Sequence, residues 1–154
     1  MTMIQLLRVA ADHPDFRELI KLLDKDLWSR YPDTQQFFDA HNQVKLDANA
    51  MVAYLDDVPV GCGCYREAGD EHTVEIKRMF VKEEARGRGI AQRIVKELEQ
   101  WAFEEGKQDA LLETGTGQPE AISLYKKLGY VQVANYGPYI GSEESVCMGK
   151  KLRL

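Results

Sequence analysis

The chain has 154 residues, enough for one domain with a core of ordinary size, and its 44% hydrophobic and 29% charged residues are typical of a folded, soluble protein. Its net charge of −5 argues against a general nucleic-acid-binding protein, although arginines can still form a local basic patch. No apolar run approaches the roughly 20 residues of a membrane span, so we expect no membrane contact and no signal peptide.

The cysteines and histidines indicate neither a disulfide framework nor a metal site. Three cysteines are an odd number, and none of the three histidines has a metal-like spacing to the others. Cys62 and Cys64 lie two apart in a strand-like run, so both should point to one face and be buried. We therefore expect a cytoplasmic protein that binds no metal.

The N-terminal part of the chain predicts one strand and two helices. Residues 3–9 are apolar with β-branched members, as in a strand. Residues 14–28 carry apolar side chains at helical spacing, and Asp12 and Pro14 suit the start of a helix. A weaker helix is expected over residues 34–42.

A three-stranded meander should follow. The expected strands cover residues 48–55, 58–67 and 72–81. Asp56-Asp57 is a two-residue hairpin signal between the first two strands. Gly61 and Gly63 are unusual within a strand and indicate a bulge, or a close approach of another group to the backbone.

The second half of the chain alternates helices with strands. Apolar residues form a helical stripe from Ile90 to Ala102, and Gly106 ends it. The remaining elements are strands over residues 109–113, 130–133 and 145–152 and a helix over residues 119–128. Residues 79–111 form a strand–helix–strand unit of crossover length, so these two strands should run parallel. The order predicts an α/β or α+β fold in which helices cover a mixed sheet.

A glycine-rich turn with arginines opens the helix at Ile90. Free backbone N–H groups of a first helical turn and the positive end of the helix dipole suit an anion such as a polyphosphate. Glycine permits close approach of the backbone to a ligand, and we expect Arg86 and Arg88 to add charge-assisted hydrogen bonds. Arg93, one turn further on, is either a third phosphate ligand or a solvated charge.

Two common nucleotide-binding motifs do not fit this turn. A dinucleotide fingerprint requires a third glycine, but Gln92 and Glu120 stand at that position after the two Gly-x-Gly pairs. A phosphate-binding P-loop requires Ser or Thr after Gly-Lys, and Gly106-Lys107 is followed by Gln108.

Two stretches in the second half of the chain match known signatures. Arg86-Gly87-Arg88-Gly89-Ile90-Ala91 matches Arg/Gln-x-x-Gly-x-Gly/Ala, and Leu124-Tyr125-Lys126-Lys127-Leu128-Gly129-Tyr130 matches Leu-Tyr-x-Lys-Leu-Gly-Phe/Tyr. Through these signatures, residues 75–150 resemble the GNAT superfamily of acyl-CoA-dependent N-acetyltransferases. Further stretches over residues 48–152 look like a small single-domain bacterial branch. The resemblance implies one N-acetyltransferase domain over residues 1–154. It also implies a mostly antiparallel sheet of six to seven strands, about four helices, and one parallel strand pair splayed at the coenzyme A site.

The resemblance implies acetyl-CoA as the co-substrate. Backbone amides of residues 86–91 would hold its pyrophosphate, and the strand Met79-Phe80-Val81 would pair with its pantetheine arm. An N–H near Met79 or Phe80 would polarise the acetyl carbonyl. Many members carry Asn in the loop before the last helix, where Gln118 or Thr116 stands here, and we expect Gln118 to contact the cofactor.

Two proton transfers accompany acyl transfer to an amine, and three residues are candidates for them. The second signature places Tyr125 as the general acid for the leaving thiolate, unless it is simply a core aromatic. Glu75 is the candidate base because strand alternation places it on the same face as Met79, and Glu113 is the second choice. The alternative for Glu75 is an exposed carboxylate paired with Lys77 or Arg66.

The expected acceptor is a primary amine on a small molecule such as an amino acid. Tyr31, Tyr136 and Tyr139 are candidates for the acceptor pocket, or else rim aromatics, because early helices and a late hairpin usually frame it in this family. A protein or peptide acceptor and a non-catalytic acyl-CoA-binding regulatory domain are the alternatives. An edge strand near the C-terminus is compatible with a homodimer.

Overall fold

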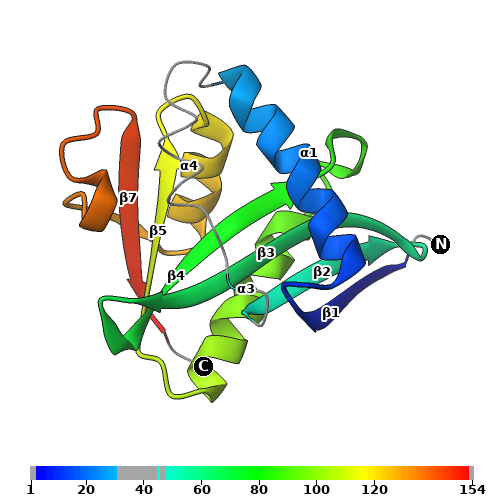
Figure 1. Cartoon of the computed structure of the whole chain (residues 1–154), viewed down its shortest axis with the longest axis horizontal. Coiled ribbons are helices and arrows are strands. Elements are labelled where there is room, and N and C mark those ends of the chain that lie inside the picture. The colour runs from blue at the N-terminus through cyan, green and yellow to red at the C-terminus, as the bar shows by residue number, and fades with distance from the viewer. Residues whose placement is uncertain (1–2, 31–44, 46–47, 153–154) are drawn as a thin grey trace.

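The computed structural model describes residues 3–30, 45 and 48–152, whose elements follow the predicted order (Figure 1). The strands are β1 (Ile4–Ala10), β2 (Asn49–Leu55), β3 (Val58–Ala68), β4 (Asp70–Val81), β5 (Asp109–Gly115), β6 (Val131–Val133) and β7 (Ser145–Lys151). The helices are α1 (Pro14–Arg30), α3 (Ile90–Glu104) and α4 (Pro119–Lys127), with short 3-10 helices η1 (Glu83–Ala85) and η2 (Gly137–Tyr139). The helix expected over residues 34–42 lies outside the described residues. No helix in the described ranges is long and apolar enough to cross a membrane.

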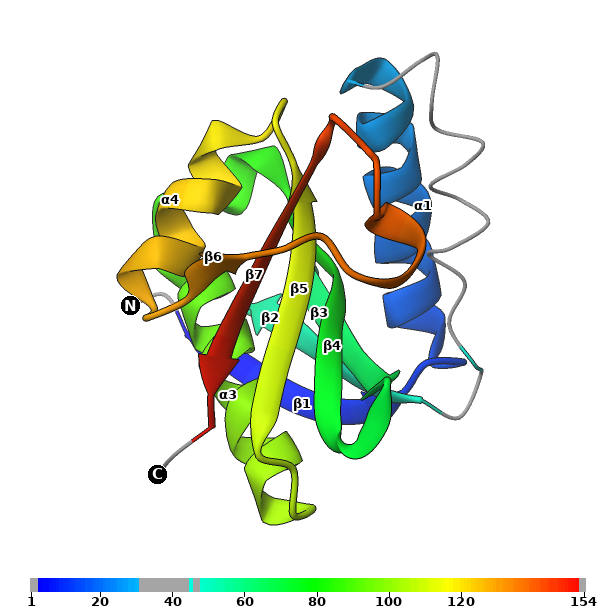
Figure 2. The same cartoon turned by 90° about the vertical axis from the view of Figure 1, so that its left-hand side faces the viewer.

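One sheet contains all seven described strands, in the order β1-β2-β3-β4-β5-β7-β6. Neighbouring strands are antiparallel except β4 and β5, which run parallel. Helix α3 connects this pair, so the parallel crossover predicted from the sequence is confirmed. Helices α3 and α4 cover one face of the sheet and α1 covers the other (Figure 2).

The β2–β3 hairpin and the packing of α3 follow from local sequence signals. Asp56 and Asp57 have φ angles of 49° and 70°, which is the left-handed geometry of a type I′ hairpin turn. A Cβ atom added to Gly63 would lie 3.1 Å from side-chain atoms of both Ile94 and Leu98 on α3. The glycine therefore lets the helix approach the strand closely, as the sequence indicated.

A β-bulge in β4 lies opposite Gly63. Cys62 pairs with Phe80 and Cys64 pairs with Lys77, so two residues of β4 stand opposite one residue of β3. The first of them, Arg78, has a φ of 59°, which is unusual for a non-glycine residue.

The bulge changes which side chains of β4 share a face. Before it, Ile76 packs in the cluster under α3, and Lys77 lies opposite Cys64 in the cluster under α1. After it, Met79 packs toward α3 and Phe80 packs toward α1. Glu75 alternates with Ile76 and therefore points toward the α1 side. The expectation that Glu75 and Met79 share a face is wrong, because it assumed uninterrupted alternation.

Strands β4 and β5 separate after a short parallel ladder. Their register pairs Thr73–Ile76 with Asp109–Leu112 only, although β4 continues to Val81 and β5 to Gly115. The splayed parallel pair expected from the family resemblance is confirmed. The free edges beyond Ile76 and Leu112 make the opening in which the candidate site lies.

Candidate active site

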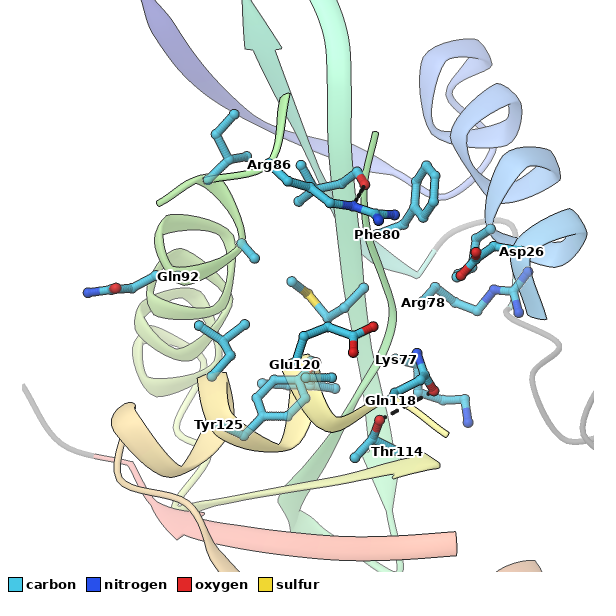
Figure 3. A pocket seen from close by; sticks show the side chains of 18 of the residues that line it. Asp26, Lys77, Arg78, Phe80, Arg86, Gln92, Thr114, Gln118, Glu120 and Tyr125 are labelled. Atoms are coloured by element: carbon cyan, nitrogen blue, oxygen red, sulfur yellow. Dashed lines mark hydrogen bonds between the residues drawn. The ribbon is translucent and has the colours of Figure 1, made fainter. Parts of the chain in front are cut away.

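A cavity of about 420 Å³ occupies the gap between the splayed strands. Its walls come from α1, the second half of β4, the turn before α3, the first turn of α3, the end of β5 and helix α4. Figure 3 shows side chains from these elements pointing into a common space. Segments far apart in the sequence therefore meet at one site.

The glycine turn has the open geometry that an anion requires. Gly87 and Gly89 have φ angles of 81° and 75°, and a Cβ atom added to either would meet nothing within 4 Å. Gly89 is the N-cap of α3, and it supplies no side chain to bond the first N–H groups of the helix. Those N–H groups and the helix dipole therefore remain for a ligand, and Gly87, Gly89, Ile90 and Ala91 all line the cavity.

The arginines of the turn differ in where they lie. Arg86 lines the cavity, and its Nε donates a 2.9 Å hydrogen bond to the Val81 carbonyl at the end of β4. Arg88 and Arg93 are exposed and do not line the cavity. Of the three arginines, only Arg86 lines the cavity among the described residues. The phosphate roles of all three stay predictions.

The residues expected along the cofactor all face the same cavity. Met79, Phe80 and Val81 line it along β4, directly after the bulge. Gln118 lines it from the β5–α4 loop, where its side-chain oxygen lies 3.4 Å from both Gly115 N and Thr114 Oγ1. Gln118 thus closes this loop as well as bordering the cavity.

Tyr125 points into the cavity from α4 (Figure 3). It is 6% exposed, and its ring packs edge-to-face on Tyr130 with centroids 5.8 Å apart. Burial raises the pKa of the Tyr125 hydroxyl above its usual value. The hydroxyl therefore keeps its proton at neutral pH, as a general acid must before reaction.

Glu75 lies beneath the cavity rather than in its wall. It is 2% exposed, and its Oε1 accepts hydrogen bonds from Arg66 Nε at 3.1 Å and pairs with Arg66 Nη2 at 3.0 Å. Its Oε2 accepts a 2.8 Å bond from the Tyr136 hydroxyl and lies 3.8 Å from Lys77 Nζ. The sequence alternative, in which Glu75 pairs with Arg66 or Lys77, is therefore present, but Glu75 is buried and not exposed.

Glu113 does line the cavity, from the end of β5. Burial raises its pKa to about 7, and the negative charge of Glu75 acts in the same direction. A hydrogen bond with Ser145 and the positive charge of Lys77 oppose this rise. A carboxyl group that is half ionised near pH 7 suits proton transfer better than the fully paired Glu75.

The two tyrosines of the late hairpin contact the charged residues next to the cavity. Neither Tyr136 nor Tyr139 lines the cavity. The Tyr136 hydroxyl donates to Glu75, the Tyr139 hydroxyl accepts a 2.8 Å bond from Lys77 Nζ, and the two rings pack edge-to-face. Tyr31, the third candidate for the acceptor pocket, lies outside the described residues.

Sequence reasoning missed the basic wall formed by Lys77 and Arg78. Both line the cavity, and their side chains are only 5% and 6% exposed. Arg78 Nη2 pairs with Asp24 Oδ1 of α1 at 2.5 Å. Two adjacent basic residues in the middle of a strand covered on both faces are unusual, and that signal pointed to a site.

Comparisons with known proteins agree with this geometry. The model of the acetyltransferase (GNAT) family matches residues 13–130. A relative named IAA acetyltransferase, from Azospirillum brasilense, is 35% identical over 136 residues, which make up 88% of this chain and 89% of that protein.

Solved structures with the same fold carry related names. A Klebsiella pneumoniae protein assigned to the acyl-CoA N-acyltransferases is 27% identical, has a TM-score of 0.81, and the match covers 98% of this chain and 99% of that one. The PaiA N-acetyltransferase of Thermoplasma acidophilum, solved in complex with coenzyme A, is 17% identical with a TM-score of 0.71, covering 97% and 99% of the two chains. The family model, the relative and the fold agree, and this chain belongs to the GNAT family of acetyltransferases.

Proposed function

We propose that this acetyltransferase uses acetyl-CoA to acetylate a primary amine on a small molecule. The observation that carries the proposal is that Glu113 and Tyr125 line one cavity, which begins at the N-terminus of α3. The cavity has the volume of a small-molecule site, and α1 supplies one of its walls. Both features favour a compact acceptor over an extended peptide.

The residues around the cavity fit coenzyme A. The open turn at Gly87 and Gly89 suits the pyrophosphate, and the N-terminus of α3 adds its dipole. The free edge of β4 over residues 79–81 suits the amides of the pantetheine arm, which would add to the strand as a peptide does. Bound in this way, acetyl-CoA supplies an acyl group activated as a thioester.

Glu113 is the proposed base for the acceptor amine. An alkyl ammonium group has a pKa of about 10.4 in water, so it must lose a proton before it can attack. The Glu113 carboxylate takes that proton, directly or through water, and its pKa near 7 keeps a large fraction ionised at neutral pH. The structure thereby favours the second of the two carboxylates considered from the sequence.

Tyr125 is the proposed acid for the departing thiolate. Its buried hydroxyl retains a proton and faces the space between β4 and α4 (Figure 3). The proton moves from the hydroxyl oxygen to sulfur as the carbon–sulfur bond breaks. Positioned proton transfer of this kind contributes about 10² to 10⁴ in rate.

The name of the Azospirillum relative also supports a small acceptor, since that protein is named for acetylation of IAA. A protein acceptor and a non-catalytic acyl-CoA-binding domain remain the competing functions.

A screen of primary amines with detection of free thiol separates these functions. The full chain and acetyl-CoA are incubated with amino acids, aliphatic and aromatic amines, and lysine-containing peptides. We expect release of coenzyme A with a small amine. Turnover with peptides alone would favour the protein acceptor, and coenzyme A binding without turnover of any amine would favour the binding domain.

A further inference from the structure

The guanidinium of Arg78 is buried at the α1 side of the cavity, where it pairs with Asp24. Arg78 belongs to the bulge in β4, and Leu23, Asp26 and Leu27 of α1 also line the cavity. Figure 3 shows Arg78 and Lys77 on one side of the cavity and Tyr125 of α4 on the other, with Arg86 beside Phe80 at the end of β4. Two basic side chains thus line the cavity away from the glycine turn, and the Asp26 carboxylate of α1 lies beside Arg78 (Figure 3).

Among the described residues, most of the hydrogen-bonding capacity of Arg78 has no partner. A guanidinium carries five N–H donors, and only Nη2 has a partner among the described residues, the Asp24 carboxylate. The side chain is 94% buried, since 6% of it is exposed. Buried donors are nearly always bonded in folded proteins, to protein or to water, so the remaining N–H groups at the cavity are available to a ligand with acceptor atoms.

Lys77 places a second cation on the same wall. Its ammonium donates to the Tyr139 hydroxyl and lies 3.8 Å from Glu75 Oε2, which leaves part of its donor capacity unused. Glu75 already pairs with Arg66 through its other oxygen. Glu75 thus serves two cations, and Glu113 is the second carboxylate that acts on Lys77, so the donors that Lys77 leaves unused face the cavity beside Arg78.

We propose that the acceptor carries a carboxylate as well as its amine, and that Arg78 binds this carboxylate with Lys77 beside it. The inference rests on the proposed function and specifies its substrate as an amino acid or an amine-bearing organic acid. A planar carboxylate matches the parallel N–H groups of a guanidinium. The acceptor amine then lies toward Glu113, whose carboxylate provides the opposite charge, and an apolar side chain suits Leu23 and Leu27.

Acetyl-CoA does not supply the missing anion. Its phosphates fit the turn at Gly87 and Gly89, which belongs to the α3 end of the cavity. The pantetheine arm that would run along β4 is uncharged. A carboxylate bound by Arg78 therefore comes, in this proposal, from the second substrate.

Matched amines that differ only at the carboxylate test this proposal on the unmodified chain. The probes are leucine, leucinamide and isoamylamine, and phenylalanine, phenylalaninamide and phenethylamine, each at saturating acetyl-CoA. We expect kcat/KM to be about 30-fold or more higher for the acid than for its amide or its decarboxylated amine, as for loss of one charged hydrogen-bonded partner. Equal values across a set would overturn the carboxylate site and leave the proposed function standing. No turnover of any amine, with coenzyme A still bound, would overturn both.

Substitution of Arg78 identifies the residue responsible. Arg78→Met should lower kcat/KM for the acid by about 30-fold, mainly through KM, and change that for isoamylamine less than about threefold. Arg78→Asn is a second variant, because Asn tolerates the left-handed backbone conformation at this position. Arg17→Met, at an exposed position of α1, is the matched control. Coenzyme A affinity by calorimetry reports whether each variant is folded. A folded Arg78 variant that keeps the full preference for acids would refute the assignment.

Discussion

Replacing Glu113 with glutamine removes the proposed base while preserving the size of the side chain. Positioned acid–base groups contribute about 10² to 10⁴ in rate, so kcat should fall at least about 100-fold. With a pKa of about 7, roughly one tenth of the Glu113 side chains are ionised at pH 6 and nine tenths at pH 8. Wild-type kcat/KM should therefore rise about tenfold between these pH values, and Glu113→Gln should lose this dependence.

Glu113→Gln should lower activity but raise the stability of the folded protein at pH 8. Folding raises the Glu113 pKa from its ordinary value of 4.5 to about 7, so the folded state binds this proton more tightly than the unfolded state. The stabilisation from the bound proton is present below pH 4.5 and is lost as pH rises through 7, a change of up to about 3 kcal/mol. Because glutamine does not ionise, Glu113→Gln should unfold at a higher temperature than the wild type at pH 8 and at a similar temperature at pH 4.5.

The assay is release of free thiol from acetyl-CoA across pH 5.5 to 9, together with thermal unfolding at the two pH values. Glu143→Gln, an exposed carboxylate in the late hairpin, serves as the control and should leave both measurements unchanged. A Glu113→Gln variant that retains the wild-type rate and pH profile would refute the assignment of the base. An unfolding temperature lowered at pH 8 would contradict the raised pKa.

Two further substitutions test the acid and the packing. Tyr125→Phe should keep coenzyme A affinity and lower kcat by about 10²-fold or more, measured by calorimetry and thiol release, and unchanged turnover would exclude the general-acid role. Gly63→Ala places a Cβ atom 2.4 Å from Met79 Sδ and 3.1 Å from Ile94 and Leu98 side-chain atoms, so it should destabilise the fold by about 1–3 kcal/mol. Denaturant unfolding measures that loss, with exposed Ser123→Ala as the control, and a variant as stable as the wild type would contradict the close approach of α3.

The positions of the strands and helices could be predicted because each segment has a clear local pattern. The stripe that starts at Ile90 fixed α3, Pro119 and Gly129 bounded α4, and the Asp56-Asp57 pair marked a turn that indeed has left-handed φ angles. The crossover length between β4 and β5 then determined their parallel pairing. These features depend on neighbouring residues or on chain length, which a sequence displays directly.

The orientation of side chains around β4 could not be predicted in the same way. The bulge at Arg78 depends on the opposing glycine of β3 and on the approach of α3, which are contacts between distant segments. Gly63 indicated that a bulge or a close approach exists, but not which strand carries the extra residue. The extra residue places Met79 on the opposite face from Glu75, and without it the sequence did not reveal that Lys77 and Arg78 line the cavity.

The charged side chains around Glu75 are buried or half-buried, which stabilises a fold little, so their effect on the site explains their presence better than folding does. Glu75, Arg66 and Lys77 form a buried or half-buried charge cluster, capped by the tyrosines of the late hairpin. Such clusters are often no more stabilising than well-packed apolar residues. We expect this one to matter because its charges act on Glu113: Glu75 raises the pKa of Glu113 and Lys77 lowers it.

Glu75→Gln separates a base from a positioning residue. Glutamine can still accept a hydrogen bond from Tyr136 or Arg66, but it removes the negative charge that raises the Glu113 pKa and leaves the opposing charge of Lys77 in place. The acid limb of the kcat/KM profile should therefore move to lower pH, while the plateau rate changes less than about tenfold. A loss of about 100-fold at every pH, with Glu113→Gln active, would instead make Glu75 the base. A shifted limb is the outcome that only an electrostatic role for Glu75 produces, because a merely structural defect would lower the rate without moving the pKa.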